Sequence, residues 1–192
     1  MARFRRSFVF ISILVAVGLV PVFAVGQSRT SAGAGHSDWR ARLNQELQLM
    51  GHRNWIAVVD SAYPLQTSTG IETVETNDDQ LEVVKTVLAL IAKSEHVRPV
   101  VFTDAELKLV PESDAKGVTA YREALATVLS RSEAQSVPHE EIISKLDEAG
   151  KTFHILVLKT RMTIPYTSVF VRLECGYWSA DAEKRLRAAM AH

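Results

Sequence analysis

Residues 49–64 read LMGHRNWIAVVDSAYP, and this stretch decides the fold class. Its centre, WIAVV at Trp55–Val59, is a continuous apolar run between Asn54 and Asp60. Five apolar residues bounded by polar ones are typical of a strand that is buried on both faces, as in the sheet of an α/β protein. The sequence around this run therefore predicts a sheet with helices on both sides.

Segments with apolar residues at helical spacing alternate with further apolar runs along the rest of the chain. Helices are predicted over residues 37–50, 79–94, 116–131, 138–150 and 181–192, the second capped by Asn77 or Asp78. Further strands are predicted over residues 99–103, 153–158 and 167–173, with a short one over 107–110, and residues 61–75 are predicted to be a loop. This alternation predicts the α/β class, as a single three-layer αβα domain with a mostly parallel or mixed central sheet.

The composition is that of an ordinary globular protein. Hydrophobic residues make up 47% and charged residues 23% of the 192 positions, which argues against disorder. Lys and Arg number 22, as do Asp and Glu, so no basic surface for nucleic acid is expected. Cys175 is the only cysteine, which excludes an intramolecular disulfide and favours a small buried hydrophobe in a strand.

The start of the chain has the three-part pattern of a secretory signal peptide. Arg3, Arg5 and Arg6 form a positive segment, the apolar residues 8–20 follow, and small residues up to Gly26 fit a cleavage site. The apolar run is shorter than the roughly 18 residues that a membrane anchor needs. An exported protein is therefore expected, with an uncleaved anchor as the minor alternative.

The sequence divides into three parts on this interpretation. Residues 1–26 are the signal peptide, residues 27–36 (QSRTSAGAGH) are a flexible linker, and residues 37–192 are the folded domain. The expected location is the periplasm or the outside of the cell, with no membrane attachment after the signal peptide is removed.

Short motifs for nucleotides, catalytic metals and hydrolase nucleophiles are absent from the sequence, so no cofactor and no metal are expected. Four polar residues remain at the ends of predicted elements. His52 precedes the first strand and Asp60 follows it, His139 begins a helix, and Tyr166 precedes the last strand. Each residue alone is typical of a cap or a turn, and periodicity does not join the four into one site.

Two stretches resemble the D-ribose pyranase / L-fucose mutarotase (RbsD/FucU-like) family. Residues 49–64 resemble its opening pattern, which is a Gly-His-x-Asp segment, a hydrophobic strand and Asp-Ala-x-x-Pro. Residues 155–176, ILVLKTRMTIPYTSVFVRLECG, are similar to its closing pattern, which is a strand, a Thr-Gly-Glu turn, Pro-Tyr-x-Asn, a second strand and a glycine. The resemblance implies the fold of that family.

The resemblance also implies a site and a reaction. His52, Asp60 and His139 match catalytic positions, and Tyr166 and Ser168 match substrate-binding positions. Family members interconvert cyclic forms of a reducing sugar such as ribose or fucose, a reaction that needs general acid/base catalysis without a cofactor. The expected function is an exported mutarotase or pyranase-like isomerase, working as a ring-shaped homo-oligomer with sites near the subunit contacts.

Three departures from the family pattern keep other functions open. Ser168 stands in place of an asparagine, Arg161-Met162 replaces Gly-Glu, and Arg53-Asn54 lies where an acidic residue is common. A serine can bond a sugar hydroxyl but lacks the donor and acceptor pair of an amide. The alternatives are a non-catalytic exported carbohydrate-binding protein and an exported scaffold without a small-molecule site.

Overall fold

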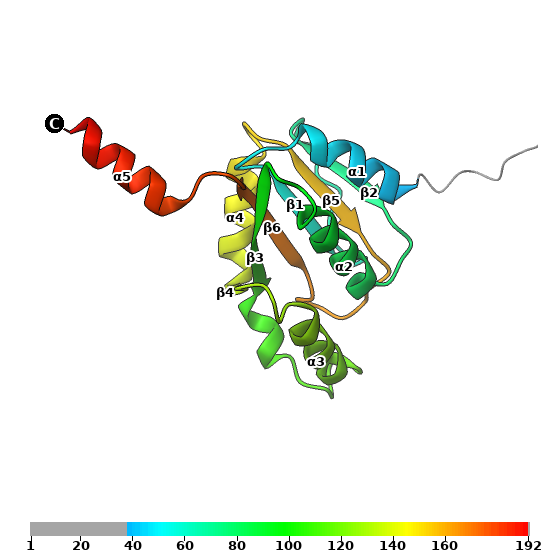
Figure 1. The fold of residues 1–192 in the computed structure, drawn as a ribbon. Helices are drawn as coiled ribbons and strands as arrows, with labels where there is room; N and C mark the ends of the chain where they lie inside the picture. The colour runs from blue at the N-terminus through cyan, green and yellow to red at the C-terminus, as the bar shows by residue number, and fades with distance from the viewer. Residues whose placement is uncertain (1–37, 192) are drawn as a thin grey trace, which may run out of the picture. The chain divides into compact units, whose positions relative to one another are not determined.

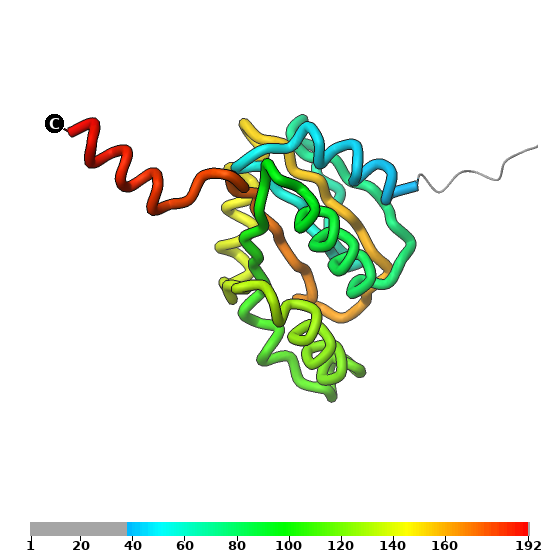
Figure 2. The backbone as a smooth tube through the Cα atoms, in the orientation of Figure 1, coloured from blue at the N-terminus to red at the C-terminus, as the bar shows by residue number. Residues whose placement is uncertain are grey.

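The computed structural model describes residues 38–191, so the predicted signal peptide (1–26) and linker (27–36) lie outside the described residues. Helices and strands are interspersed along the described chain (Figure 1), and Figure 2 traces the path of its backbone. The elements in chain order are α1 (Trp39–Leu49), β1 (Trp55–Val59), β2 (Ile71–Glu75), α2 (Gln80–Ile91), β3 (Val97–Asp104), η1 (Ala105–Leu109), α3 (Val118–Val128), β4 (Gln135–Val137), α4 (His139–Ala149), β5 (Ile155–Lys159), β6 (Val169–Cys175) and α5 (Ala180–Met190).

The six strands form one mixed sheet in the order β2-β5-β1-β6-β3-β4. Central strand β1 runs parallel to β5, with Trp55 opposite Ile155, and antiparallel to β6, with Trp55 opposite Arg172. Strand β3 is also antiparallel to β6, so β6 alone runs against the other strands. The carboxyl ends of the parallel strands and the start of β6 therefore meet at the same edge of the sheet.

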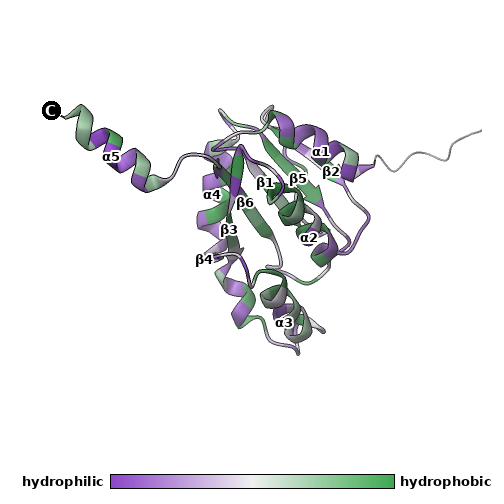
Figure 3. Cartoon of the chain, viewed as in Figure 1, coloured by the Kyte–Doolittle hydropathy of each residue, from purple (hydrophilic) through white to green (hydrophobic). Residues whose placement is uncertain are grey.

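Helices cover both faces of this sheet (Figure 1). On one face, buried residues of α1, α2 and α3 form one hydrophobic cluster with Ile56 and Val58 of β1. On the other face, buried residues of α4 belong to a second hydrophobic cluster with Ala57, Val59 and Phe170. The central strands are hydrophobic along their length, whereas α1 and α4 also carry hydrophilic residues (Figure 3). The prediction of a three-layer α/β fold with a mixed sheet is confirmed.

Two segments have a different secondary structure from the one predicted. Residues 71–75, inside the predicted loop 61–75, form β2, and residues 107–109 lie in the 3-10 helix η1 instead of a strand. Strand β2 lies at the edge of the sheet, where it pairs with β5 and buries only Val74 of its own residues. Its sequence, IETVE, therefore contains glutamates and lacks the continuous apolar run that is typical of a central strand. In η1 only Leu107 is buried, and a short helical turn is sufficient to bury one side chain, so no strand is needed.

Helix α2 is capped by Asp79 and not by Asn77 or Asp78, the two predicted caps. The Asp79 carboxylate accepts hydrogen bonds from the backbone N–H groups of Leu81, at 2.9 Å, and Glu82, at 3.3 Å. A cap at Asp79 satisfies two N–H groups that have no partner within the helix.

The Asp79→Ala variant is expected to lower the free energy of unfolding by about 1 kcal/mol, because it removes this cap. Urea denaturation followed by circular dichroism measures the change. Lys93→Ala, an exposed position just after α2, is the control. Equal stability of the two variants would contradict the capping role.

The end of the chain adds little to the core. Helix α5 buries no residue, and Cys175 at the end of β6 is only half-buried, although full burial was predicted. Of the helices in residues 38–191, none is both long enough and apolar enough to span a membrane. The residues that position a site therefore come from α1 to β6.

Candidate functional site

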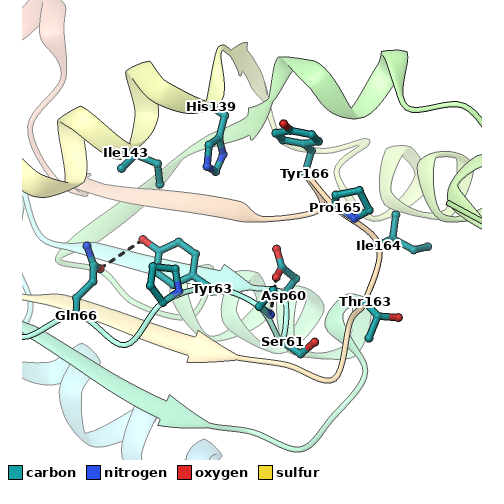
Figure 4. Close-up of a pocket in the computed structure, with 12 residues that line it drawn as sticks. Asp60, Ser61, Tyr63, Gln66, His139, Ile143, Thr163, Ile164, Pro165 and Tyr166 are labelled. Atoms are coloured by element: carbon teal, nitrogen blue, oxygen red, sulfur yellow. Dashed lines mark hydrogen bonds between the residues drawn. The ribbon is translucent and has the colours of Figure 1, made fainter. Parts of the chain in front are cut away.

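A pocket of about 540 Å³ lies at the edge where the carboxyl ends of the parallel strands meet (Figure 4). The loop after β1, the first turns of α4 and the turn before β6 supply its walls. The lining residues are Asp60, Ser61, Ala62, Tyr63, Pro64, Gln66, His139, Ile143, Thr163, Ile164, Pro165 and Tyr166. Its volume and its place in the sheet are typical of small-molecule sites in α/β proteins.

Asp60 is the acidic side chain that lines this pocket. It follows the last residue of β1 and is half-buried. One oxygen, Oδ1, accepts a hydrogen bond from the backbone N–H of Ala62 at 2.8 Å, which fixes the carboxylate in the turn. Figure 4 shows the carboxylate directed into the pocket. Asp60 can therefore accept a hydrogen bond from a ligand hydroxyl, or a proton.

His139 enters the pocket from the first position of α4, with its side chain 32% exposed. Its ring atom Nδ1 lies 3.1 Å from Oδ1 of Asp104, the last residue of β3. Asp104 is only 2% exposed, and burial raises the pKa of its carboxyl, an effect that the hydrogen bond from His139 opposes. With Nδ1 engaged, Nε2 is the ring nitrogen left for a ligand.

Tyr166 lines the pocket beside His139. The two rings meet edge to face, with centroids 5.5 Å apart and planes at 83°. Tyr166 has a backbone φ of 59°, a left-handed conformation that is uncommon for a residue with a side chain. The next residue, Thr167, is buried and holds the turn, because its hydroxyl donates to the carbonyl of Ile164 at 2.8 Å. The strained turn presents an aromatic ring to the pocket.

Tyr63 forms part of the wall of the pocket. It is 6% exposed, and its hydroxyl donates to Oε1 of Gln66 at 3.4 Å. Burial raises the pKa of Tyr63 to about 12, with further contributions from the negative charges of Asp147, Asp104 and Asp60. The phenol therefore stays neutral at physiological pH and keeps its hydrogen-bond donor.

The structure brings together three of the five predicted site residues, namely Asp60, His139 and Tyr166. Ser168 is not among the residues that line the pocket, and it is only 2% exposed just before β6. His52 is exposed in the turn before β1, at the opposite edge of the sheet. The five residues of β1 separate it from Asp60 by about 16 Å along the strand, so the two cannot meet within one chain.

Sequence reasoning missed Asp104, Tyr63 and Gln66. Asp104 is the last residue of a largely apolar strand, and Asp60 directly follows one, so the criterion that selected Asp60 would also have found Asp104. Its link to His139 spans 35 positions in the chain and depends on the pairing of β3 with β4. No local pattern indicates such a contact.

A second group of side chains lies near the start of β5, away from the pocket. Glu46, Glu72 and His154 place potential metal ligands within 4.8 Å of one another. However, Arg42 already bonds Glu72 through Nε at 2.8 Å and Nη2 at 2.6 Å, and Glu46 through Nη2 at 2.9 Å. Both carboxylates are therefore paired with a guanidinium, as in a structural ion-pair network.

Comparison with known proteins gives one family match. The RbsD / FucU transport protein family matches residues 39–176, which include every element from α1 to β6. No curated protein matches the chain. The family match covers the whole pocket and leaves α5 outside.

Three solved structures are similar to this chain. RbsD of Bacillus subtilis complexed with D-ribose is 20% identical, with a TM-score of 0.48, over 70% of this chain and 92% of that one. FucU from Bifidobacterium longum is 12% identical, with a TM-score of 0.48, over 70% and 94%. The fucose mutarotase of Streptococcus pneumoniae in complex with L-fucose is 15% identical, with a TM-score of 0.44, over 68% and 89%.

Proposed function

This chain belongs to the RbsD / FucU transport protein family, and from that premise we propose that its pocket binds a monosaccharide and interconverts the cyclic forms of the sugar. The observation that carries the proposal is the pocket that joins Asp60, His139 and Tyr166, with His139 bonded to the buried Asp104. The pocket offers a carboxylate, an imidazole and an aromatic ring, which suit the hydroxyls and the C–H face of a sugar such as ribose or fucose.

The proposed reaction opens and recloses the sugar ring by proton transfer. Opening needs one group to take the proton of the anomeric hydroxyl and another to give a proton to the ring oxygen, and closure needs the reverse. Nε2 of His139 can take or give a proton, because an imidazole nitrogen that is not otherwise engaged is a suitable general acid/base. Asp60 accepts hydrogen bonds from the sugar and assists as a second proton carrier.

NMR saturation transfer between the anomers of ribose and of fucose tests the proposal. The purified protein is expected to accelerate exchange for at least one of the two sugars over the rate in buffer. A folded protein that binds a sugar without accelerating exchange would support the second candidate function, a non-catalytic carbohydrate-binding protein. The burial of Ser168 favours this candidate, because that position then adds no polar group to the pocket.

We propose that His52 acts in this site only from a second copy of the chain. Because His52 lies at the opposite edge of the sheet, the catalytic role implied for it requires a homo-oligomer in which its turn faces the pocket of a neighbour. A ring-shaped assembly supplies such head-to-tail contacts. Sedimentation of the purified protein measures the assembly, and a plain monomer would exclude this role.

Mixing two inactive variants tests the same proposal more sharply. His52→Ala and His139→Ala should each lose exchange activity, and mixed assemblies should regain it at roughly a quarter of the sites, where both intact histidines meet. The variants need to be dissociated and reassembled together, with each variant reassembled alone as the control. Full activity of His52→Ala alone would remove His52 from the site.

We further propose that the protein is exported through its N-terminal segment. The support is the arginine cluster followed by the uncharged run 8–20. Cell fractionation and the mass of the mature protein measure the location and the cleavage site, which is expected near residue 26. A full-length protein in the cytoplasm would contradict export.

A further inference from the structure

The buried carboxylate of Asp104 contacts His139 but does not itself line the pocket. Asp104 ends β3 with 2% of its surface exposed. Its Oδ1 contacts His139, and its Oδ2 is buried with no hydrogen-bond partner among the described residues. An ionisable group in such a place costs stability, because burial disfavours its charged form. A hydrophobic or amide side chain would fill the same position without the cost of burying a charge, so a role specific to the carboxylate is indicated.

A second carboxylate from the same segment holds the same residue. Glu106, two positions after Asp104, accepts a hydrogen bond from the backbone N–H of His139 with both oxygens, at 3.1 and 3.0 Å. Helix α4 begins after Pro138, whose side chain has no atom that can accept a hydrogen bond. Glu106 therefore takes the place of the capping residue. Residues 104–106 therefore anchor His139 twice, through the ring and through the backbone.

The contact with Asp104 decides which ring nitrogen carries the proton. An ionised carboxylate only accepts hydrogen bonds, so Nδ1 of a neutral His139 must be the N–H group. Nε2 is then an unprotonated base directed to the ligand. Once Nε2 takes a proton from the sugar, the negative charge of Asp104 stabilises the imidazolium that results.

We infer that Asp104 is a positioning residue, which holds His139 in the tautomer that accepts a proton from the sugar. This role rests on the proposed function for its catalytic part. The tautomer itself is a property of the free protein and is tested separately. The other reading of the contact is purely structural, with the pair joining β3 to the start of α4.

The variant Asp104→Asn separates the two readings. The amide can donate to Nδ1 in place of accepting from it, which would move the proton of neutral His139 to Nε2. Nitrogen-15 NMR of the imidazole is expected to show the Nδ1–H form in the wild type and a shift toward the Nε2–H form in Asp104→Asn. The anomer exchange rate at saturating sugar should fall about tenfold, the effect of losing one charge-assisted hydrogen bond, while sugar affinity changes little.

Asp114→Asn is the matched control, since Asp114 is exposed and its side chain bonds only the neighbouring Ser113 among the described residues. It should leave both the tautomer and the exchange rate at wild-type values. A wild type with the Nε2–H form, or an Asp104→Asn variant with unchanged tautomer and rate, would overturn the positioning role. If the wild type accelerates no sugar, the proposed function fails, while the imidazole spectrum still decides the tautomer.

Measuring stability against pH distinguishes a lower exchange rate from a folding defect in Asp104→Asn. Burial raises the pKa of Asp104, helped by the charges of Glu106 and Asp60 and opposed by His139. A raised pKa means that the contribution of Asp104 to stability is fully present below its unfolded pKa and is lost as the pH rises through its folded pKa. The Asp104→Asn variant should lack this loss and unfold at neutral pH no more easily than the wild type. A clear drop in its unfolding midpoint would support the structural reading instead.

Discussion

Replacing His139 by asparagine should lower the protein-catalysed rate of anomer exchange by about 100-fold, the lower range for loss of a general acid/base. The reason is that Nε2 of His139 is the ring nitrogen in the pocket that remains free once Asp104 has engaged Nδ1. Asparagine is preferable to alanine here, because its amide can still donate to the buried carboxylate of Asp104 and so avoids leaving that group without a partner. NMR saturation transfer at saturating sugar measures the effect.

The control for this variant is Glu140→Gln, an exposed position next to His139 on the first turn of α4. It should keep the wild-type exchange rate. The unfolding midpoints of both variants should lie close to that of the wild type, which separates a chemical effect from a loss of structure. An exchange rate within twofold of the wild type in a folded His139→Asn protein would assign the chemistry to other groups.

The second large effect concerns stability. Gln80, at the start of α2, is fully buried and joins three parts of the chain. Its Nε2 donates to the hydroxyl of Tyr121 at 3.2 Å and to the carbonyl of Thr167, and its Oε1 accepts from the hydroxyl of Thr160 at 2.9 Å. The Tyr121 hydroxyl also donates to the Thr167 carbonyl, at 2.9 Å. This network ties α2 and α3 to the segment that carries Tyr166.

The Gln80→Leu variant is expected to lose about 3 kcal/mol of unfolding free energy, because it keeps the volume but removes three buried hydrogen bonds. Urea denaturation measures the loss. Gln48→Leu, an exposed position on α1, is the control and should change stability by less than about 0.5 kcal/mol. A loss below 1 kcal/mol at Gln80 would mean that the network adds little to stability.

The Gln80→Leu variant should also weaken sugar binding. Thr167 follows Tyr166 directly, and its buried carbonyl is the group that Gln80 and Tyr121 hold. Tyr166 has a left-handed backbone conformation that needs such support. Ligand titration of the folded variant is expected to show lower affinity than in Gln48→Leu, since the turn that presents the ring is less well held.

The local sequence pattern was sufficient to predict the elements whose side chains are largely buried in the core. The run Trp55–Val59 lies in the middle of the sheet and is buried at every position, so its apolar sequence marks it as a strand without other information. The helices also carry periodic apolar faces. The edge strands β2 and β4 were missed, because a strand with one neighbour buries little and needs no apolar run.

The sequence by itself determined the α/β class, the central strand and the residues that lie at the ends of strands and helices. The resemblance to a family selected five residues for one site, and the structure places three of them, Asp60, His139 and Tyr166, around one pocket. These predictions depend only on the hydrophobicity and the turn residues of short continuous segments, which the sequence shows directly.

Only the tertiary structure decided which of these ends face the same space. Strand order places the end of β1, the end of β3 and the start of β6 at one edge, which joins Asp60, Asp104 and Tyr166 to His139. The same order puts His52 at the opposite edge, although it lies only eight positions before Asp60. The physical reason is that strand pairing forms between distant segments, and its register and direction are set by the packing of the whole core.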